Sequence, residues 1–183
     1  MESLANQFLI AMPGMADPNF ARSVTFICQH DDSGALGIII NRPAELRLGE
    51  MLRQLKLPAA GAVAHQPVYN GGPVHGERGF VLHEEIGDWE STLPVGEDLG
   101  LTTSQDILRA VGEGHGPRRF LVALGYAGWG GGQLEQELTA NAWLNGPADP
   151  DVIFDTPLEA RWAAAARLLG VDLGRVSSEA GHA

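Results

Sequence analysis

The chain has 183 residues, enough for one domain whose core needs no disulfide or structural metal. Its 12 basic against 23 acidic residues give a net charge of −11, which argues against direct nucleic-acid binding, because such binding requires Lys and Arg to displace counterions. The single cysteine excludes an internal disulfide. No apolar stretch approaches the roughly 20 residues of a membrane span, and the start lacks the basic segment of a signal peptide. We therefore expect a soluble cytoplasmic protein with no membrane partner.

In the first half of the chain, apolar runs between turn residues predict strands, and one apolar pattern with helical spacing predicts a helix. The expected order is a strand at Phe8–Met12, a turn capped by Asp17, strands at Ser23–His30 and Ala35–Asn41 joined by a turn at Asp31–Gly34, a helix at Leu48–Leu57, a loop at Gly61–Gln66, and strands at Val68–Asn70 and Gly79–His83. The glycine pair Gly71-Gly72 is typical of a hairpin turn between the last two strands, with close approach of a ligand as the alternative.

The second half alternates helices with strands. The expected order is an edge strand at Asp88–Pro94, a helix at Thr103–Gly112 capped by Thr102 or Thr103, a central strand at Phe120–Leu124, a helix within Gln133–Leu144, a strand at Val152–Phe154, and a helix that starts at the capping box Thr156–Glu159 and ends near Leu169. The tail from Gly174 is expected to be loose. Hairpins followed by alternating helices and strands favour a single α+β domain, residues 1–183, with a mixed sheet.

The segment from Leu124 to Leu138 is the most informative part of the chain. It reads as a strand, a glycine turn that carries Tyr126 and Trp129, and a helix with Glu135 in its first turn. Glycine is used where φ must be positive or where another group must approach the backbone, so the segment predicts a shaped site. Two interpretations remain open: Tyr126 and Trp129 shape a ligand pocket, or they fill the core while the glycines make a wide turn.

Asn41 and Arg42 follow the end of a predicted strand, a common place for binding groups. Arg42 is a candidate clamp for a carboxylate or phosphate through two hydrogen bonds. The alternative is that Arg42 pairs with an acidic side chain, for which Glu135, Glu137 and Asp155 are the candidates.

Three further side chains carry candidate chemistry. His83 and Glu135 are candidates for ligand binding or acid/base work, although a histidine at the end of an apolar strand is more often a satisfied core residue. Cys28 is a candidate redox residue, because His30 is two positions away and is expected on the same face of the strand. The six histidines show no metal-ligand spacing, and no phosphate-binding or nucleophile motif occurs, so neither a metal nor a cofactor is predicted.

Ordered blocks along nearly the whole chain resemble the AlgH/YqgE family of bacterial proteins. They are Phe8-Leu9-Ile10-Ala11-Met12-Pro13, Asp17-Pro18-x-Phe20-x-Arg22-Ser23-Val24, Gly34-Ala35-x-Gly37-x-x-x-Asn41-Arg42-Pro43, Gly71-Gly72-Pro73-Val74, Arg78-Gly79-Phe80-Val81-Leu82-His83, Leu124-Gly125-Tyr126-Ala127-Gly128-Trp129 and Gln133-Leu134-Glu135. The resemblance implies an α+β fold with a branched sheet, a small barrel-like part and surrounding helices. It implies a bacterial cytosolic protein with no established activity, from a family whose members are labelled as transcriptional regulators. Related chains often carry cysteine where Cys28 stands.

Three functional hypotheses follow. The leading one is a non-enzymatic protein that binds a small molecule or a protein partner and affects transcription indirectly, with Asn41 and Arg42 as anion contacts and Tyr126 and Trp129 shaping the pocket. The second is a metal-independent hydrolase or transferase, which requires His83 or Glu135 to share a cleft with Arg42. The third is a thiol-based sensor that uses Cys28.

Overall fold

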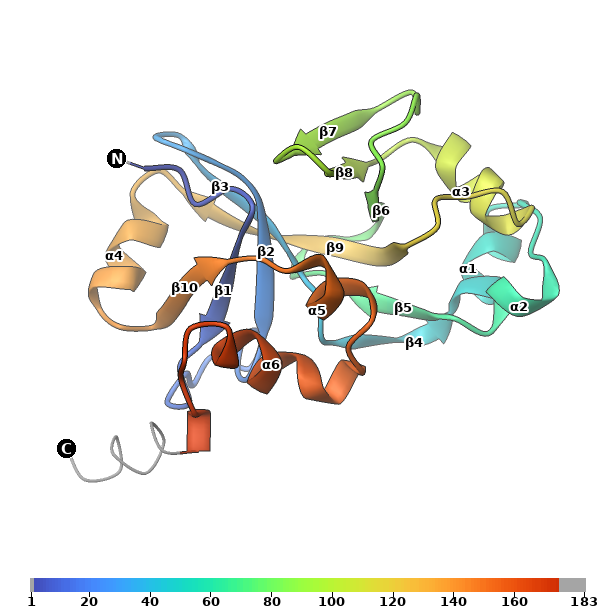
Figure 1. Ribbon diagram of the computed structural model, residues 1–183. Coiled ribbons are helices and arrows are strands. Elements are labelled where there is room, and N and C mark those ends of the chain that lie inside the picture. Colours follow the sequence, from blue (N-terminus) through green and yellow to red (C-terminus); the bar gives the residue numbers. More distant parts are fainter. Residues whose placement is uncertain (1, 175–183) are drawn as a thin grey trace.

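The computed structural model describes residues 2–174, so the tail predicted to be loose lies outside the described residues except for Gly174. Ten strands form one curled sheet (Figure 1). The strands are β1 (Gln7–Ala11), β2 (Val24–Asp31), β3 (Gly34–Ile39), β4 (Pro43–Arg47), β5 (Pro67–Asn70), β6 (Val74–Glu84), β7 (Thr92–Val95), β8 (Leu99–Thr102), β9 (Phe120–Gly130) and β10 (Trp143–Pro147). The order β10-β1-β2-β3-β9-β6-β8-β7 forms the main path, with β4 and β5 on a side branch.

The sheet branches at β9, its central strand. Along one edge β9 pairs with β6. Along the other edge its partner changes: Ala123 and Leu124 lie beside β5 in parallel, whereas Ala127–Gly130 lie beside β3 in antiparallel orientation. The predicted α+β fold with a mixed, branched and partly barrel-like sheet is therefore confirmed.

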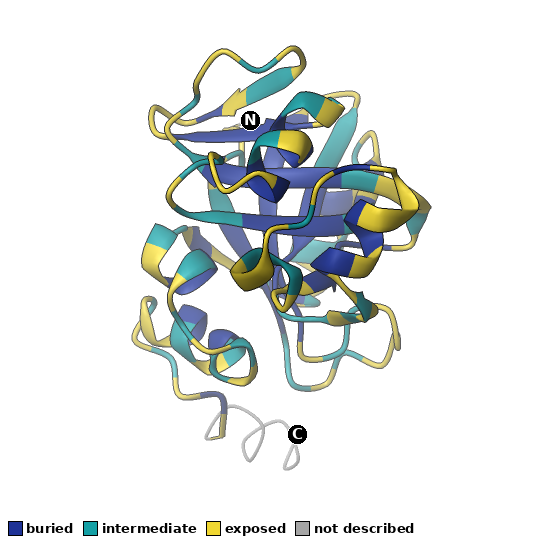
Figure 2. Ribbon diagram, turned by 90° about the vertical axis from the view of Figure 1, so that its right-hand side faces the viewer, coloured by how far each residue is buried: buried dark blue, intermediate teal, exposed yellow. Residues whose placement is uncertain are grey.

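Helices cover the sheet at three places and bury three apolar clusters. They are α1 (Leu48–Gln54), α2 (Gly61–Ala64), α3 (Gln105–Gly112), α4 (Gln133–Thr139), α5 (Pro150–Phe154) and α6 (Arg161–Arg167), with a short 3₁₀ turn at Leu158–Ala160. Helices α1–α3 gather at one end, α4 lies at the other, and α5 and α6 lie close together beside the middle of the sheet (Figure 1). Buried residues concentrate in the central strands, and exposed residues in the loops and outer helical faces (Figure 2). None of the helices within residues 2–174 is long and apolar enough to cross a membrane.

The glycine pair Gly71-Gly72 makes a junction between strands, so the predicted hairpin turn is wrong. Strand β5 pairs with β4 and β9 and has no pairing with β6. A Cβ added at Gly71 would lie 2.4 Å from the carbonyl oxygen of Gly125, and one at Gly72 would lie 2.1 Å from the carbonyl carbon of Tyr126. These glycines therefore let the chain between β5 and β6 touch the backbone of β9 where the sheet branches.

The predicted glycine turn after Leu124 is also wrong, because β9 continues through it to Gly130. Gly125 has a φ of +77°, and the register of β9 against β6 shifts beside it, so this glycine marks an irregularity within the strand and not its end. The turn is confined to the residues just before α4, where Gly132 has a φ of +79°.

The apolar run Val152–Phe154 forms helix α5, which corrects the predicted strand. Asp149 caps this helix by accepting a hydrogen bond from the Asp151 N–H at 2.9 Å, and Pro150 occupies the first turn. An N-cap aspartate followed by proline is a helix start signal that outweighs a run of three apolar residues.

Smaller differences from the predicted elements concern where helices begin and end. The expected capping box at Thr156 makes no side-chain cap, and a 3₁₀ turn precedes α6. Thr102 lies in β8, and Ser104 is the residue at the start of α3. The segment Gly61–Gln66, expected as loop, contains α2, and the helix predicted within Gln133–Leu144 ends at Thr139 before β10.

Candidate functional site

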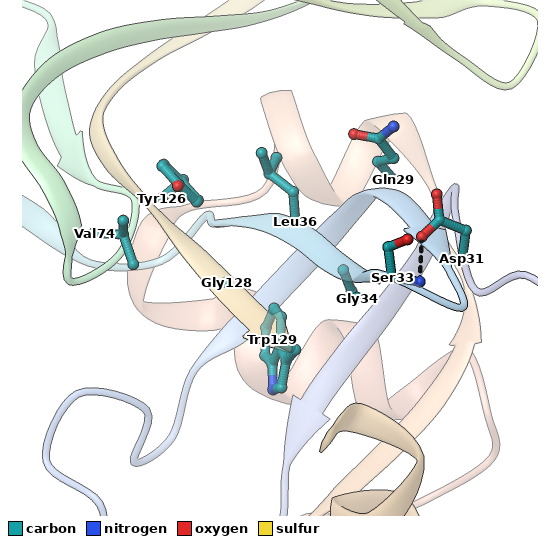
Figure 3. Close-up of a pocket in the computed structure, with 10 residues that line it drawn as sticks. Gln29, Asp31, Ser33, Gly34, Leu36, Val74, Tyr126, Gly128 and Trp129 are labelled. Atoms are coloured by element: carbon teal, nitrogen blue, oxygen red, sulfur yellow. Dashed lines mark hydrogen bonds between the residues drawn. The ribbon is translucent and has the colours of Figure 1, made fainter. Parts of the chain in front are cut away.

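A cavity of about 450 Å³ opens beside the β2–β3 hairpin and the second half of β9 (Figure 3). The residues that line it are Gln29, Asp31, Ser33, Gly34, Ala35, Leu36, Val74, Tyr126, Gly128 and Trp129. Its apolar part is formed by Leu36, Val74 and Tyr126, and its polar end by the hairpin turn. The cavity therefore offers an apolar wall next to hydrogen-bonding groups, which is the usual composition of a small-molecule site.

Tyr126 is the aromatic side chain that the predicted site contributes to this cavity. Its ring packs edge-on against Phe80, with ring centroids 5.7 Å apart, and near His75 at 5.9 Å. The phenol hydroxyl has no hydrogen-bond partner among residues 2–174 and is not a fully buried atom. The ring is thus held in place while its polar tip stays available.

Trp129 forms part of the cavity wall, but its indole points away from the side chains of Leu36 and Gln29 (Figure 3). The indole is 6% exposed and packs with Phe20 and Trp143. The carboxylate of Glu137 accepts hydrogen bonds from the Nε1–H of Trp129 at 3.2 Å and of Trp143 at 2.9 Å. Trp129 therefore belongs to the core beneath α4, which agrees with the structural alternative for this residue.

Asn41 and Arg42 hold the loop before β2, at residues 18–22, through hydrogen bonds to its backbone. Asn41 accepts a hydrogen bond from the Val24 N–H and donates one to the carbonyl of Arg22, both at 2.9 Å. The Arg42 guanidinium donates to three carbonyl oxygens, those of Pro18, Asn19 and Ala21, each at 2.6 Å. The alternative in which Arg42 pairs with Glu135, Glu137 or Asp155 is not met, because the guanidinium donates to backbone carbonyls.

The structure separates Arg42 from the aromatic residues that were expected to share its pocket. Arg42 lines a different cavity, of about 580 Å³, beside Asn70 and Gly72. The segment Gly72–Gly76 crosses β9 between the two cavities, because it contacts Tyr126 and Gly125. The role of Arg42 as an anion contact stays a prediction. Three guanidinium N–H groups already donate to backbone carbonyls, which leaves few for an anion.

Glu135 lies on α4 and bonds to His30 of β2. The Leu4 N–H donates to His30 Nδ1 at 2.9 Å, so the imidazole proton resides on Nε2 and points to the Glu135 carboxylate. This hydrogen bond lowers the pKa of Glu135. Glu135 therefore ties α4 to the sheet and lines neither the Tyr126 cavity nor the Arg42 cavity.

His83 is fully buried in β6, as expected for a satisfied core histidine. Its Nδ1 lies 3.2 Å from the Glu84 carbonyl and must carry the proton, so Nε2 accepts from the Thr102 hydroxyl at 2.7 Å. Burial lowers the pKa of His83. Neither His83 nor Glu135 shares the Arg42 cavity, so the geometry that the enzyme hypothesis requires is not met.

We expect His83 to make the protein less stable as the pH falls below 6.5. The unfolded histidine has a pKa near 6.5 and the folded one a lower value, so the unfolded state takes up more protons in this range. The free energy of unfolding should decrease by at most about 1.4 kcal/mol per pH unit from this one group. Urea unfolding at several pH values between about 5.5 and 7.5, about one unit on either side of the unfolded pKa, measures the slope. The His83→Gln variant should lack this component, and an unchanged slope would contradict the assignment.

Cys28 occupies a β-bulge in β2, where the register against β3 shifts between Ile27 and Gln29. The bulge places Cys28 in the cluster with Phe8 and Phe26, whereas His30 faces α4, so the expectation that Cys28 and His30 share a face is wrong. The thiol is 3% exposed, and burial raises its pKa far above the usual range. A buried neutral thiol is a poor nucleophile.

We therefore expect iodoacetamide to alkylate Cys28 at least about 100-fold more slowly in the folded protein than in urea. The rate is read by intact-mass spectrometry, and the urea-unfolded chain supplies the control for an accessible thiol. Comparable rates in the two states would revive the thiol-sensor hypothesis.

Sequence reasoning missed the residues that accompany Tyr126 in its cavity. Gln29 and Leu36 face each other across the β2–β3 hairpin, and the bulge at Cys28 decides which face they share. From the sequence, Asp31 was recognisable only as a turn residue. It does have this role, because its Oδ1 accepts a hydrogen bond from the Ser33 N–H at 2.8 Å. The pairing of this hairpin with β9, 90 or more positions later, is a long-range contact that no local pattern records.

Comparison with known proteins agrees with the resemblance seen in the motifs. The family model described as AlgH-like matches residues 8–174. A UPF0301 protein of Methylococcus capsulatus is 60% identical, over 99% of this chain and 97% of its own length. A UPF0301 protein of Nitrosococcus oceani is 59% identical, over 97% of this chain and 96% of its own length.

Two solved structures share the fold. The solution structure of the AlgH protein from Pseudomonas aeruginosa has a TM-score of 0.82 and 52% identity, covering 99% of this chain and 96% of that one. A crystal structure of a Corynebacterium diphtheriae protein has a TM-score of 0.76 at 20% identity, covering 97% and 92%, which shows the fold alone. The match to the family model over most of the chain and the near full-length relatives establish that this chain belongs to the AlgH-like family of UPF0301 proteins.

Proposed function

We propose that this protein is a non-enzymatic binding protein that binds a small molecule in the Tyr126 cavity. Binding of the molecule then changes how the protein interacts with a protein partner. The observation that carries the proposal is the cavity of about 450 Å³ in which the phenol of Tyr126 has no hydrogen-bond partner among residues 2–174. The candidate acid/base residues lie elsewhere, in contacts that hold the fold.

The cavity favours a ligand with a flat apolar part and a hydrogen-bond donor. The apolar part would lie against Tyr126 and Leu36, which stand on the same side of the sheet (Figure 3). The donor would reach Gln29 and Asp31 at the hairpin, where the second carboxylate oxygen of Asp31 is exposed and unbonded among the described residues. A protonated amine or a hydroxyl group attached to a flat ring meets both conditions.

An effect on transcription would then be indirect. The net charge of −11 opposes contact with a phosphate backbone, whereas it does not hinder binding to a protein. The family label of transcriptional regulator is compatible with a protein that signals through a partner.

The test is a thermal-shift panel of nucleotides, sugar phosphates, amines and carboxylates on the full chain. A true ligand at 100 times its dissociation constant adds about 2.7 kcal/mol of stability. For a chain of this size we expect the unfolding temperature to rise by roughly 5–11 °C. A response confined to one chemical class supports the small-molecule site and names its ligand class.

Two variants locate the response. Tyr126→Phe removes only the hydroxyl and should weaken the shift, while Tyr126→Ala should abolish it. Leu168→Ala is the control, because Leu168 is an exposed apolar residue that lines none of the cavities described above. A ligand shift that survives Tyr126→Ala would place the site elsewhere, and a panel with no response would shift the proposal to a protein partner alone, tested by pull-down.

A further inference from the structure

A separate cavity of about 300 Å³ lies among β5, the start of β9, α5 and α6. Helices α5 and α6 adjoin each other next to these strands in Figure 1. Phe120, Ile153 and Phe154 contribute to the apolar part of a wall that is mostly polar. Three arginines also line the cavity: Arg118, Arg119 and Arg161.

Arg161 is a buried charge without an acidic partner. The residue is 5% exposed, and no carboxylate lies within ion-pair distance among residues 2–174. Its Nε donates to the carbonyl of Thr156 at 2.9 Å and its Nη1 to that of Ile40 at 2.5 Å. The guanidinium also lies over the Tyr69 ring, 5.1 Å from the centroid.

These contacts leave part of the guanidinium unused. Nη2 of Arg161 donates to none of the described residues, and it is not among their fully buried unpaired atoms, so it reaches the cavity surface. Burying an unpaired charge is costly, and proteins usually place a counter-ion beside it.

Arg119, at the rim of the same cavity, shows the contrast. It is bound by Glu84, Asp151 and Asp155, at distances of 3.0, 2.9 and 2.6 Å. These carboxylates raise the pKa of Arg119 and satisfy its charge. Arg118 is exposed and has no hydrogen bond or ion pair among the described residues. Arg161 and Arg118 are thus the two lining arginines that have no direct acidic partner among the described residues, whereas all three carboxylates are held on the Arg119 side of the cavity.

We propose that this cavity binds a small oxyanion, a phosphate or carboxylate group, with Arg161 as its buried counter-ion and Arg118 at the entrance. Arg161 presents Nη2 to the anion, while the carbonyls of Thr156 and Ile40 accept from Nε and Nη1 and hold the guanidinium in place. Phe120, Ile153 and Phe154 supply the apolar part of the wall beside the anion. This site is distinct from the Tyr126 cavity and is independent of the function proposed above.

The experiment titrates the full chain with inorganic phosphate and, separately, with benzoate, against chloride at equal ionic strength. Binding is followed by the arginine Nε–H signals in ¹H–¹⁵N spectra and by the unfolding temperature. We expect a saturable shift of the Arg161 signal and a higher unfolding temperature with at least one oxyanion. Binding of phosphate but not benzoate would indicate a site for a bare oxyanion. Binding of benzoate would indicate a site for a carboxylate that carries an apolar body.

Matched variants decide the assignment. Arg161→Lys keeps the charge but loses the planar fork and should weaken binding about tenfold or more. Arg118→Gln should weaken it without affecting the fold, because Arg118 is exposed, and Asp155→Asn should strengthen it by removing a negative charge from the rim. Arg53→Gln, an exposed arginine on α1 away from this cavity, is the control and should bind as wild type.

No saturable shift with either oxyanion would overturn the proposal. So would equal affinity in the wild type, Arg118→Gln and Asp155→Asn. If Arg161→Lys does not fold, the opposite effects expected for Arg118→Gln and Asp155→Asn still test the site.

Discussion

Gly72→Ala is expected to destabilise the protein by at least about 3 kcal/mol, because no space exists for a methyl group at this position. The Cβ would lie 2.1 Å from the carbonyl carbon of Tyr126, and the φ of +154° is unfavourable for any residue with a side chain. The backbone of β9 cannot yield easily, since β3 and β6 pair with it on both sides. The strand junction must therefore open for the variant to fold.

Urea unfolding of Gly72→Ala and the wild type measures the loss, which corresponds to a fall of roughly 6–12 °C in unfolding temperature for a chain of this size. Gly76→Ala is the matched control. Gly76 follows four positions later, and a Cβ there would meet no atom within 4 Å. The control should change stability by less than about 0.5 kcal/mol. Equal stability of the two variants would show that the junction is not as tightly packed as described.

Glu137→Leu is expected to cost about 2–4 kcal/mol, because one carboxylate oxygen accepts the indole hydrogen bonds of two buried tryptophans. Trp129 and Trp143 are 6% and 4% exposed, so neither N–H has ready access to water when Glu137 is lost. The effect should appear as a lower free energy of unfolding, with a changed tryptophan signal in near-ultraviolet circular dichroism.

Glu137→Gln is the matched control for this prediction. The amide oxygen can still accept from both indoles without the negative charge, so the loss should stay below about 1 kcal/mol. A leucine variant as stable as the glutamine variant would mean that the indoles find other partners. That result would remove Glu137 as the link between α4 and the tryptophan cluster.

The elements that sequence patterns predicted well are those whose signal is local. Strands β1, β2 and β3 follow continuous apolar runs, and the Asx turn at Asp31 joins β2 to β3 as expected. Helix α1 follows its apolar spacing. Strands β4, β8 and β10 were missed because Pro, Gly, Asn or charged residues interrupt each of these short segments, so no apolar run or clear period remains.

The structural role of a glycine depends on contacts that lie far away in the sequence. The same residue permits a turn, a bulge or a close backbone contact, and only the neighbouring chain shows which one is needed. Gly71 and Gly72 read as a hairpin turn, but the contact with Gly125 and Tyr126, more than 50 positions later, decides their role. The glycines between Gly125 and Gly130 read as a turn, whereas pairing with β3 and β6 keeps them in a strand.

The sequence by itself determined the α+β class, the family and the general acidity of the surface, because these depend on composition, local periodicity and ordered motifs. The tertiary structure alone decided which candidate side chains meet. It divided Arg42 from Tyr126, paired Glu135 with His30, and left Arg161 buried without a carboxylate. Each of these depends on contacts between residues far apart in the chain, which strand pairing and packing set and which no local pattern encodes.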